Sequence, residues 1–250
     1  MTKRVGVGTL LNVFLRSFLI QGSWNYHSML GSGFAFAMLP VLKKLYGDDP
    51  EALEAAIRRH LDHFNAHPYL STVALGATIH MELDGEPPEA IRRFKTAVRG
   101  PLGGLGDALV WAAWLPAVSL LSMTLYWLSA PVPVVLITFL VLYNLGHLGL
   151  RIWGFRIGLQ DGRLVGRHLG ASKLGRWTQL LSAGGALLVG LLAGSILVTP
   201  GGLADAGVLW TLLAAVGMIL GDILGHRAWR PAAAIVVSII VVLAAWGGLQ

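Results

Sequence analysis

The segment QGSWNY at residues 21–26 combines amide and aromatic side chains directly after an apolar stretch. Amide groups can hydrogen-bond to sugar hydroxyls, and an aromatic face can cover the apolar face of a sugar ring. This pattern predicts that Gln21, Trp24 and Asn25 contact a sugar. The alternative is that the segment anchors the chain at a membrane surface, with its amides hydrogen-bonded inside the protein.

A second unusual segment is GPLGGLGD at residues 100–107, just before a long apolar stretch. It contains the helix-disfavouring residues Gly100, Pro101, Gly103, Gly104 and Gly106. Because these residues disfavour a regular helix, we predict a structural loop whose backbone faces a polar ligand or allows another chain to approach closely. Asp107 would then cap the helix that follows. The alternative is a tight capped turn without a ligand, and the Lys-Ser or Lys-Thr of a phosphate-binding P-loop is absent.

Three histidines, His60, His63 and His67, follow one another at spacings of three and four residues, which puts them on one face of a helix. Two histidines at such spacing can bind zinc, and the catalytic HExxH motif places a glutamate between them. That glutamate is absent, and the chain contains no cysteine. We therefore predict a solvated helix face, no metal site and no cofactor.

The elements that carry these residues are predicted to be helices, most of them in lipid. Hydrophobic residues make up 55% of the chain and charged residues 13%, whereas a soluble domain averages about 25% charged residues. Apolar stretches long enough to span a bilayer occur at about 107–128, 131–150, 179–199, 206–225 and 231–249. We predict an all-α, polytopic membrane protein with about five C-terminal transmembrane helices, divided into an N-terminal region (1–100) and a transmembrane region (101–250).

The positions of Lys and Arg predict the orientation in the membrane. In the C-terminal half they precede the first stretch and then occur in every second connection: Arg92, Arg93, Lys95 and Arg99; Arg151, Arg156, Arg163, Arg167, Lys173 and Arg176; Arg227 and Arg230. Basic connections face the cytoplasm. The N-terminal region is thus predicted on the cytoplasmic side and the C-terminus outside. Since the net charge of +6 arises from these clusters, we predict no binding to nucleic acid.

The N-terminal region has shorter apolar stretches at 28–42 and 69–81, which we predict to be re-entrant or interfacial segments. Between them we predict an amphipathic helix at about 50–66, capped by Asp49 and stopped by Pro68. Its apolar face repeats at Leu53, Ile57, Leu61 and Phe64. Its other faces carry Arg58, Arg59 and Asp62, which indicates a helix on the cytoplasmic surface.

Two ionisable residues fall inside predicted transmembrane stretches, His147 and Asp222. Such groups often have a function. We predict that His147, with Asn144, hydrogen-bonds to a neighbouring helix, and that Asp222 forms a surface ion pair beside His226 and Arg227. An intramembrane enzyme using His147 or Asp222 is an alternative.

The order of these motifs resembles the IID component of the mannose/fructose/sorbose phosphotransferase family. The resemblance covers the first 110 residues through QGSWNY at 21–26, GFAFAMLPVLKKLY at 33–46, RRHLDHFNAHPYLSTVALG at 58–76 and above all GPLGGLGD at 100–107. A weaker similarity follows in NLGHLGLRIWGFRIGLQDG at 144–162. Beyond these segments the agreement is in hydropathy and order.

The resemblance implies a non-catalytic transport subunit of the cell (inner) membrane. Such a subunit pairs with a IIC subunit to form the sugar-translocating unit, while cytoplasmic IIA and IIB proteins supply phosphate to the incoming hexose. It also implies a trimer of IIC–IID pairs. Under this hypothesis Gln21, Asn25, Asn65 and Asp107 contact the sugar or shape its cavity, and Arg58 and Arg59 face IIB.

The sequence also departs from the family pattern. The family commonly has an Arg before a Pro in the first spanning helix, where this chain has Leu115-Pro116, and its outside segment shrinks here to about 200–206. His27 stands where the family often has a charged residue. The alternative is therefore a structural or regulatory membrane scaffold that derives from the family and does not transport sugar.

Overall fold

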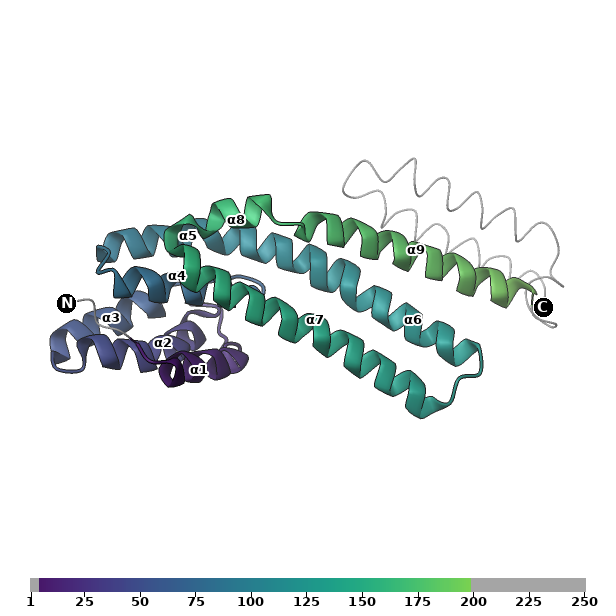
Figure 1. The fold of residues 1–250 in the computed structure, drawn as a ribbon, viewed down its shortest axis with the longest axis horizontal. Helices are drawn as coiled ribbons and strands as arrows, with labels where there is room; N and C mark the ends of the chain where they lie inside the picture. Colours follow the sequence, from purple (N-terminus) through teal and green to yellow (C-terminus); the bar gives the residue numbers. More distant parts are fainter. Residues whose placement is uncertain (1–4, 199–250) are drawn as a thin grey trace. The chain divides into compact units, whose positions relative to one another are not determined.

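A computed structural model describes residues 5–198, and these form helices without a named strand. The all-α prediction is thus confirmed for the described part. The elements are α1 (Val7–Arg16), η1 (Ser17–Leu19), α2 (Gly31–Tyr46), α3 (Pro50–Leu61), α4 (Ser71–Leu83), α5 (Pro88–Gly106), η2 (Asp107–Trp114), α6 (Leu115–Trp127), α7 (Val132–Asp161), η3 (Gly162–Leu164), α8 (Val165–Ala171) and α9 (Leu174–Val198). Figure 1 shows how these helices are arranged. By its internal contacts the chain divides into two compact units, 1–188 and 189–250.

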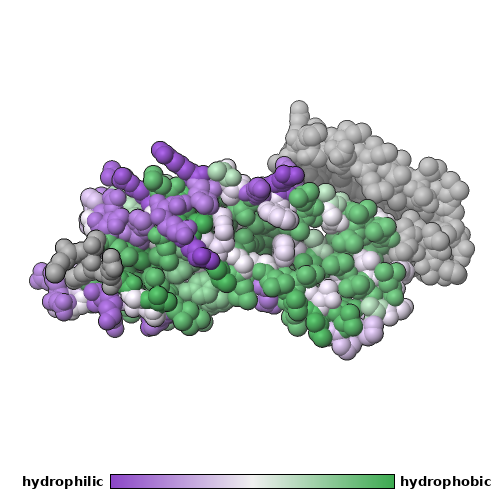
Figure 2. All heavy atoms as spheres, in the orientation of Figure 1, coloured by the Kyte–Doolittle hydropathy of each residue, from purple (hydrophilic) through white to green (hydrophobic). Residues whose placement is uncertain are grey.

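Two helical stretches in the described part are long and apolar enough to cross a membrane, Pro88–Trp127 and Val132–Ala171. They contain the first two predicted transmembrane stretches. Figure 2 shows hydrophobic side chains gathered over α6 and α7 and hydrophilic ones over the other end of this unit. The third predicted stretch, 179–199, falls in α9, and those at 206–225 and 231–249 lie outside the described residues. The count of five remains a prediction.

The second long helix is continuous where the sequence suggested a cytoplasmic connection from Arg151 onward. Arg151 and Arg156 both lie within α7, and Arg151 is buried. The connection therefore does not begin at Arg151 as predicted, because α7 continues to Asp161. The side of the membrane on which these arginines lie remains a prediction. The connection between the long helices and α9 is shorter and consists of η3, α8 and the residues around Lys173.

The short apolar stretch at 69–81 forms α4, which packs against α7 inside the protein. The contact depends on small residues, because the facing backbone leaves no room for a Cβ at Gly76 or at Gly158. Gly154 likewise packs against Thr72 and Val73. The stretch at 28–42 forms most of α2. Whether these helices dip into the membrane or lie at its surface remains a prediction.

The predicted amphipathic helix is α3, and Asp49 caps it as expected by accepting from the backbone N–H of Ala52 at 3.0 Å. The predicted end was wrong, because α3 stops at Leu61 rather than at Pro68. Phe64 is fully buried but lies beyond the helix.

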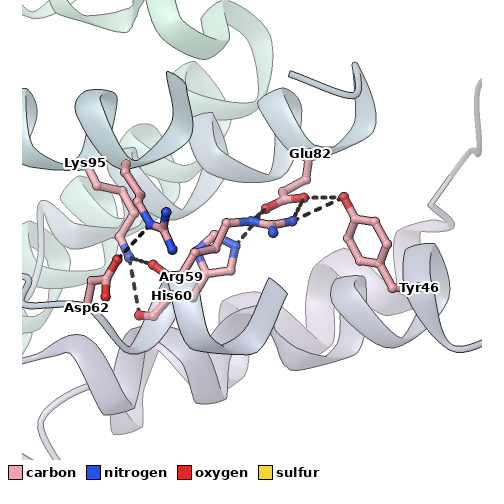
Figure 3. Close-up of polar contacts among 7 residues, drawn as sticks. Tyr46, Arg59, His60, Asp62, Glu82 and Lys95 are labelled. Carbon is pink, nitrogen blue, oxygen red and sulfur yellow. Dashed lines mark hydrogen bonds and ion pairs between the residues drawn. The ribbon is translucent and has the colours of Figure 1, made fainter. Parts of the chain in front are cut away.

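The assignment of Arg59 to a solvated surface was also wrong, because this residue is only 6% exposed. Figure 3 shows the Glu82 carboxylate of α4 between Arg59 and His60 of α3 and Tyr46 of α2. Lys95 of α5 is buried beside them and donates to the carbonyl oxygen of Arg59 at 3.0 Å. These groups tie α2, α3, α4 and α5 together. The predicted boundary at residue 100 falls within α5.

Candidate functional site

Two chain segments far apart in sequence are joined by backbone hydrogen bonds that form the first wall of a cavity. The N–H of Leu30 donates to the carbonyl oxygen of Phe64 at 2.8 Å, and the N–H of Phe64 donates to that of Ser28 at 3.2 Å. This pairing brings the turn that follows η1 beside the segment that follows α3. The C-terminal end of α5 closes the third side.

The resulting cavity has a volume of about 180 Å³. Among its lining residues are Gln21, Trp24, Asn65, His67, Gly103 and Asp107. Four of the five side chains predicted to bind substrate therefore lie around one cavity. Within the described residues, the side chains of Gln21, Asn65 and Asp107 make no hydrogen bond to the protein, so their donors and acceptors are available. An array of two amides, a carboxylate and an indole suits a polyhydroxylated ligand.

Asn25 is the predicted residue that does not line this cavity. Its Oδ1 accepts from the backbone N–H groups of His27 at 3.1 Å and Ser28 at 2.9 Å, and its Nδ2 donates to the Ser28 hydroxyl at 3.0 Å. The side chain thus closes a local turn. Asn25 therefore shapes the segment between Gln21 and Leu30.

The glycine segment is a helix and not the predicted loop. Gly100, Pro101, Gly103, Gly104 and Gly106 all belong to α5, which passes without a break through the π-helical η2 into α6. Asp107 therefore caps no helix start, and its backbone is helical. Close packing offsets the low helix propensity of glycine at Gly106, which lies directly against His67 and leaves no room for a Cβ. A π-helical turn of this kind is frequent at functional sites.

His67 is a cavity residue that the sequence analysis missed. It lies beyond the end of α3 and is 1% exposed, so the three histidines do not share a solvated helix face. Its Nδ1 accepts from the backbone N–H of Tyr69 at 3.2 Å, whereas its Nε2 has no partner among the described residues. Burial, and then the nearby Arg151 and His147, lower the pKa of His67 to about 4. The neutral ring therefore carries its proton on Nε2, as a buried donor in need of an acceptor. The signal available in the sequence was its position two residues after Asn65 and directly before a proline.

A buried arginine of α7 holds η1, the element that precedes the cavity residue Gln21. Arg151 donates from Nη1 to the carbonyl oxygen of Ser17 at 2.9 Å, which fixes η1 just before Gln21. It also donates from Nε to His147 at 2.7 Å, and His147 stacks on Tyr69 with ring centroids 4.0 Å apart. The prediction that His147 hydrogen-bonds to a neighbouring helix was wrong, because its partner lies in its own helix. Asn144 likewise donates to the carbonyl oxygen of Leu140 within α7.

The arrangement of cavity, helices and motifs can be compared with known proteins. Residues 5–201 match the family described as PTS system mannose/fructose/sorbose family IID component. The chain belongs to this family.

Named relatives of this IID chain include sugar-specific components from several bacteria. The PTS system mannose-specific EIID component of Escherichia coli (strain K12) is 33% identical over 195 residues, covering 76% of this chain and 68% of the relative. The sorbose-specific EIID component of Klebsiella pneumoniae is 32% identical, covering 79% and 71%. The fructose permease IID component of Bacillus subtilis (strain 168) is 30% identical, covering 76% and 70%.

Two solved structures share the fold. One, described as the structure of a membrane protein, has a TM-score of 0.68 and 33% identity and covers 76% of this chain and 71% of its own. The other is the cryoEM structure of the mannose transporter ManYZ in complex with microcin E492, with a TM-score of 0.61 and 27% identity, covering 98% of this chain and 97% of its own. The chain is therefore a membrane protein and a IID component of a phosphotransferase sugar-transport system.

Proposed function

We propose that the cavity around Gln21, Trp24, Asn65, His67 and Asp107 binds a hexose during translocation. One observation carries this proposal: three polar side chains with unused hydrogen-bonding groups surround a single cavity beside an indole. A sugar offers hydroxyls to such groups and an apolar ring face to the indole. The chain contributes binding and gating, while chemistry on the sugar belongs to the partners.

The proposed partners follow from the family. The IID chain pairs with a IIC membrane subunit, the pairs assemble as a trimer, and cytoplasmic IIA and IIB proteins pass phosphate to the incoming sugar. The similarity to a chain of the ManYZ mannose transporter over 98% of this chain supports assembly with a membrane partner. The exposed apolar side chains of α6 and α7, such as Met123, Leu136 and Leu140, provide surface for that partner and for lipid.

Arg58 and Arg59 do not form the exposed basic pair that was expected to dock IIB. Arg59 is buried against Glu82, and Arg58 is exposed but paired with Glu54 at 2.6 Å. We infer that IIB meets other cations of the cytoplasmic side. The N-terminal region (1–100) is proposed to lie on that side and the C-terminus outside, since Arg163, Arg167 and Lys173 gather in one connection.

A topology experiment tests the orientation. The chain has no cysteine, so Gly170→Cys introduces one exposed thiol into this connection. An impermeant maleimide applied to intact cells is expected to leave it unlabelled and to label it after the membrane is permeabilised. Labelling in intact cells would overturn the orientation.

The sugar-binding proposal is tested by thermal shift on the purified IIC–IID complex against a panel of hexoses. We expect one or a few hexoses to raise the unfolding temperature. The Asp107→Asn variant is expected to need at least ten times more hexose for the same rise. Asp48→Asn is the matched control, because Asp48 is exposed and does not line the cavity. If no hexose stabilises the complex, the scaffold alternative replaces the transport proposal.

A further inference from the structure

A second and larger cavity lies away from the proposed sugar site. It has a volume of about 540 Å³ and is bounded by η2, α7 and the connection from α8 to α9. None of the residues around the sugar cavity lines it. The cavity is independent of the proposed sugar site, whereas its position in the cytoplasmic leaflet rests on the orientation proposed above.

The walls of this cavity are apolar and aromatic. Leu109, Leu150 and Leu181 contribute aliphatic surface, while Trp114, Trp153 and Trp177 contribute indoles. Gly149 also lines it, and open space stands where a Cβ at this position would be. A hexose would leave most of its hydroxyls unpaired against such walls, so the lining suits a hydrocarbon chain.

One end of the lining is polar and cationic. Ser172, Lys173 and His168 contribute to it, from the junction between α8 and α9. His168 is paired with Asp161 at 2.9 Å. In contrast, Lys173 is exposed and has no acidic partner among the described residues, and the same holds for Arg167 and Arg176 nearby in sequence. The cavity therefore combines an apolar interior with an excess of positive charge at this junction.

We propose that this cavity binds one anionic phospholipid, with an acyl chain between α7 and α9 and the phosphate on Lys173. Basic pockets between transmembrane helices on the cytoplasmic side attract anionic headgroups, and the cytoplasmic leaflet supplies them. Trp177 follows Lys173 by four residues, and tryptophan is enriched at the level of the headgroups. A helix of a partner subunit fits less well, because at a diameter of about 10 Å a volume of this size holds little more than one turn.

The test uses the full chain with its membrane partner in nanodiscs of phosphatidylcholine, to which phosphatidylglycerol is added. We expect phosphatidylglycerol to raise the unfolding temperature and to be retained in native mass spectra, and phosphatidylcholine to do neither. Lys173→Gln is expected to weaken retention at least tenfold, and Gly149→Phe to abolish it by filling the cavity. Lys44→Gln, which removes an exposed cation of α2, is expected to leave retention unchanged.

Three outcomes would overturn the proposal. One is equal stabilisation by the two lipids, which would show that the phosphate charge is not recognised. Another is unchanged retention of phosphatidylglycerol by Lys173→Gln. The third is a cross-link from Trp177→Cys to the partner subunit in place of bound lipid, which would assign the cavity to a protein contact. Because the readout is lipid retention, failure here leaves the hexose-dependent shift untouched.

Discussion

Gly106 lies so close to His67 that a Cβ at position 106 would stand 2.1 Å from the Cβ of the histidine. This contact lets α5 approach the segment that follows α3 and brings Asp107 to the same cavity as Asn65. Gly106 therefore serves packing between two parts of the chain, whereas nothing lies within 4 Å of a Cβ at Gly100 or Gly104. A substitution is therefore expected to affect sugar binding at Gly106 and not at Gly100.

Gly106→Ala is expected to disturb the cavity, because the methyl group must displace His67 or α5. Overpacking of this kind costs about 1–3 kcal/mol of unfolding free energy. We expect a lower unfolding temperature and a loss of hexose-dependent stabilisation. Gly100→Ala is the matched control, since nothing lies within 4 Å of a Cβ at that position. Equal behaviour of the two variants would contradict the packing role.

Nε2 of His67 is closed off from solvent and has no acceptor among the described residues, and we expect it to donate a hydrogen bond to the sugar when the cavity opens around the ligand. His67→Phe keeps a ring but removes the donor, and we expect at least tenfold weaker hexose binding. His67→Gln retains an N–H donor and should bind more tightly than the phenylalanine variant. Isothermal titration of the IIC–IID complex distinguishes them. Identical affinities for the two variants would mean that the orphan donor does not meet the ligand.

The buried pair Arg59–Glu82 is expected to be a major source of stability for the N-terminal helices. Nε and Nη2 of Arg59 donate to the two carboxylate oxygens at 2.8 and 2.9 Å. Removing one partner of a buried pair costs about 3–5 kcal/mol, so Glu82→Gln should lower the unfolding temperature strongly. Glu54→Gln breaks the exposed pair with Arg58 and should cost about 1 kcal/mol or less. Similar losses in both variants would contradict this assignment.

Acid is expected to destabilise the protein, because two buried histidines stay neutral in the folded state. Burial lowers the pKa of His60 to about 4 and that of His67 to about 4. A base with a lowered pKa takes up protons more readily when unfolded, so the unfolding free energy falls as the pH drops from 6.5 towards 4. His60 alone accounts for about 3 kcal/mol over this range.

Glu82 extends the same trend to lower pH. Burial acts to raise its pKa, but hydrogen bonds from His60 and Arg59 outweigh burial and lower the pKa to about 2. Its stabilising effect is present above pH 4.5 and is lost as the pH falls towards 2. Thermal unfolding at pH 7.5 and pH 5 measures the histidine part. We expect His60→Asn to reduce the difference and His63→Gln, at an exposed site, to leave it unchanged; a pH-independent unfolding temperature would refute this account.

Part of the cavity was predictable from residue types. Gln21 and Trp24 were chosen as amide and aromatic groups beside an apolar stretch, whereas Asn65 and Asp107 were assigned to the sugar only through the resemblance to the family. The structure gathers all four around one cavity. The N-terminal cap of α3 was also predictable, because Asp-Pro is a local signal whose geometry involves only neighbouring residues.

Other features depend on tertiary contacts that no local pattern contains. The helix through Gly106 is stabilised by its contact with the facing segment at His67, which has no room for a side chain at position 106, and this contact outweighs glycine's low helix propensity. Arg59 was assigned to the surface because cations are usually exposed, yet its partner Glu82 lies 23 residues away on another helix. His67 was placed on α3 because the early helix end at Leu61 has no proline or glycine to mark it.

Protection of a single thiol in the cavity wall tests the central claim most directly. Gly103→Cys places a thiol on the lining with ordinary contact to Ala66, and Gly100→Cys places one on the same helix away from the cavity. In the IIC–IID complex, a transported hexose is expected to slow maleimide labelling at position 103 at least tenfold and to leave position 100 unaffected. Equal labelling rates at position 103 with and without every hexose tested would contradict sugar binding in this cavity.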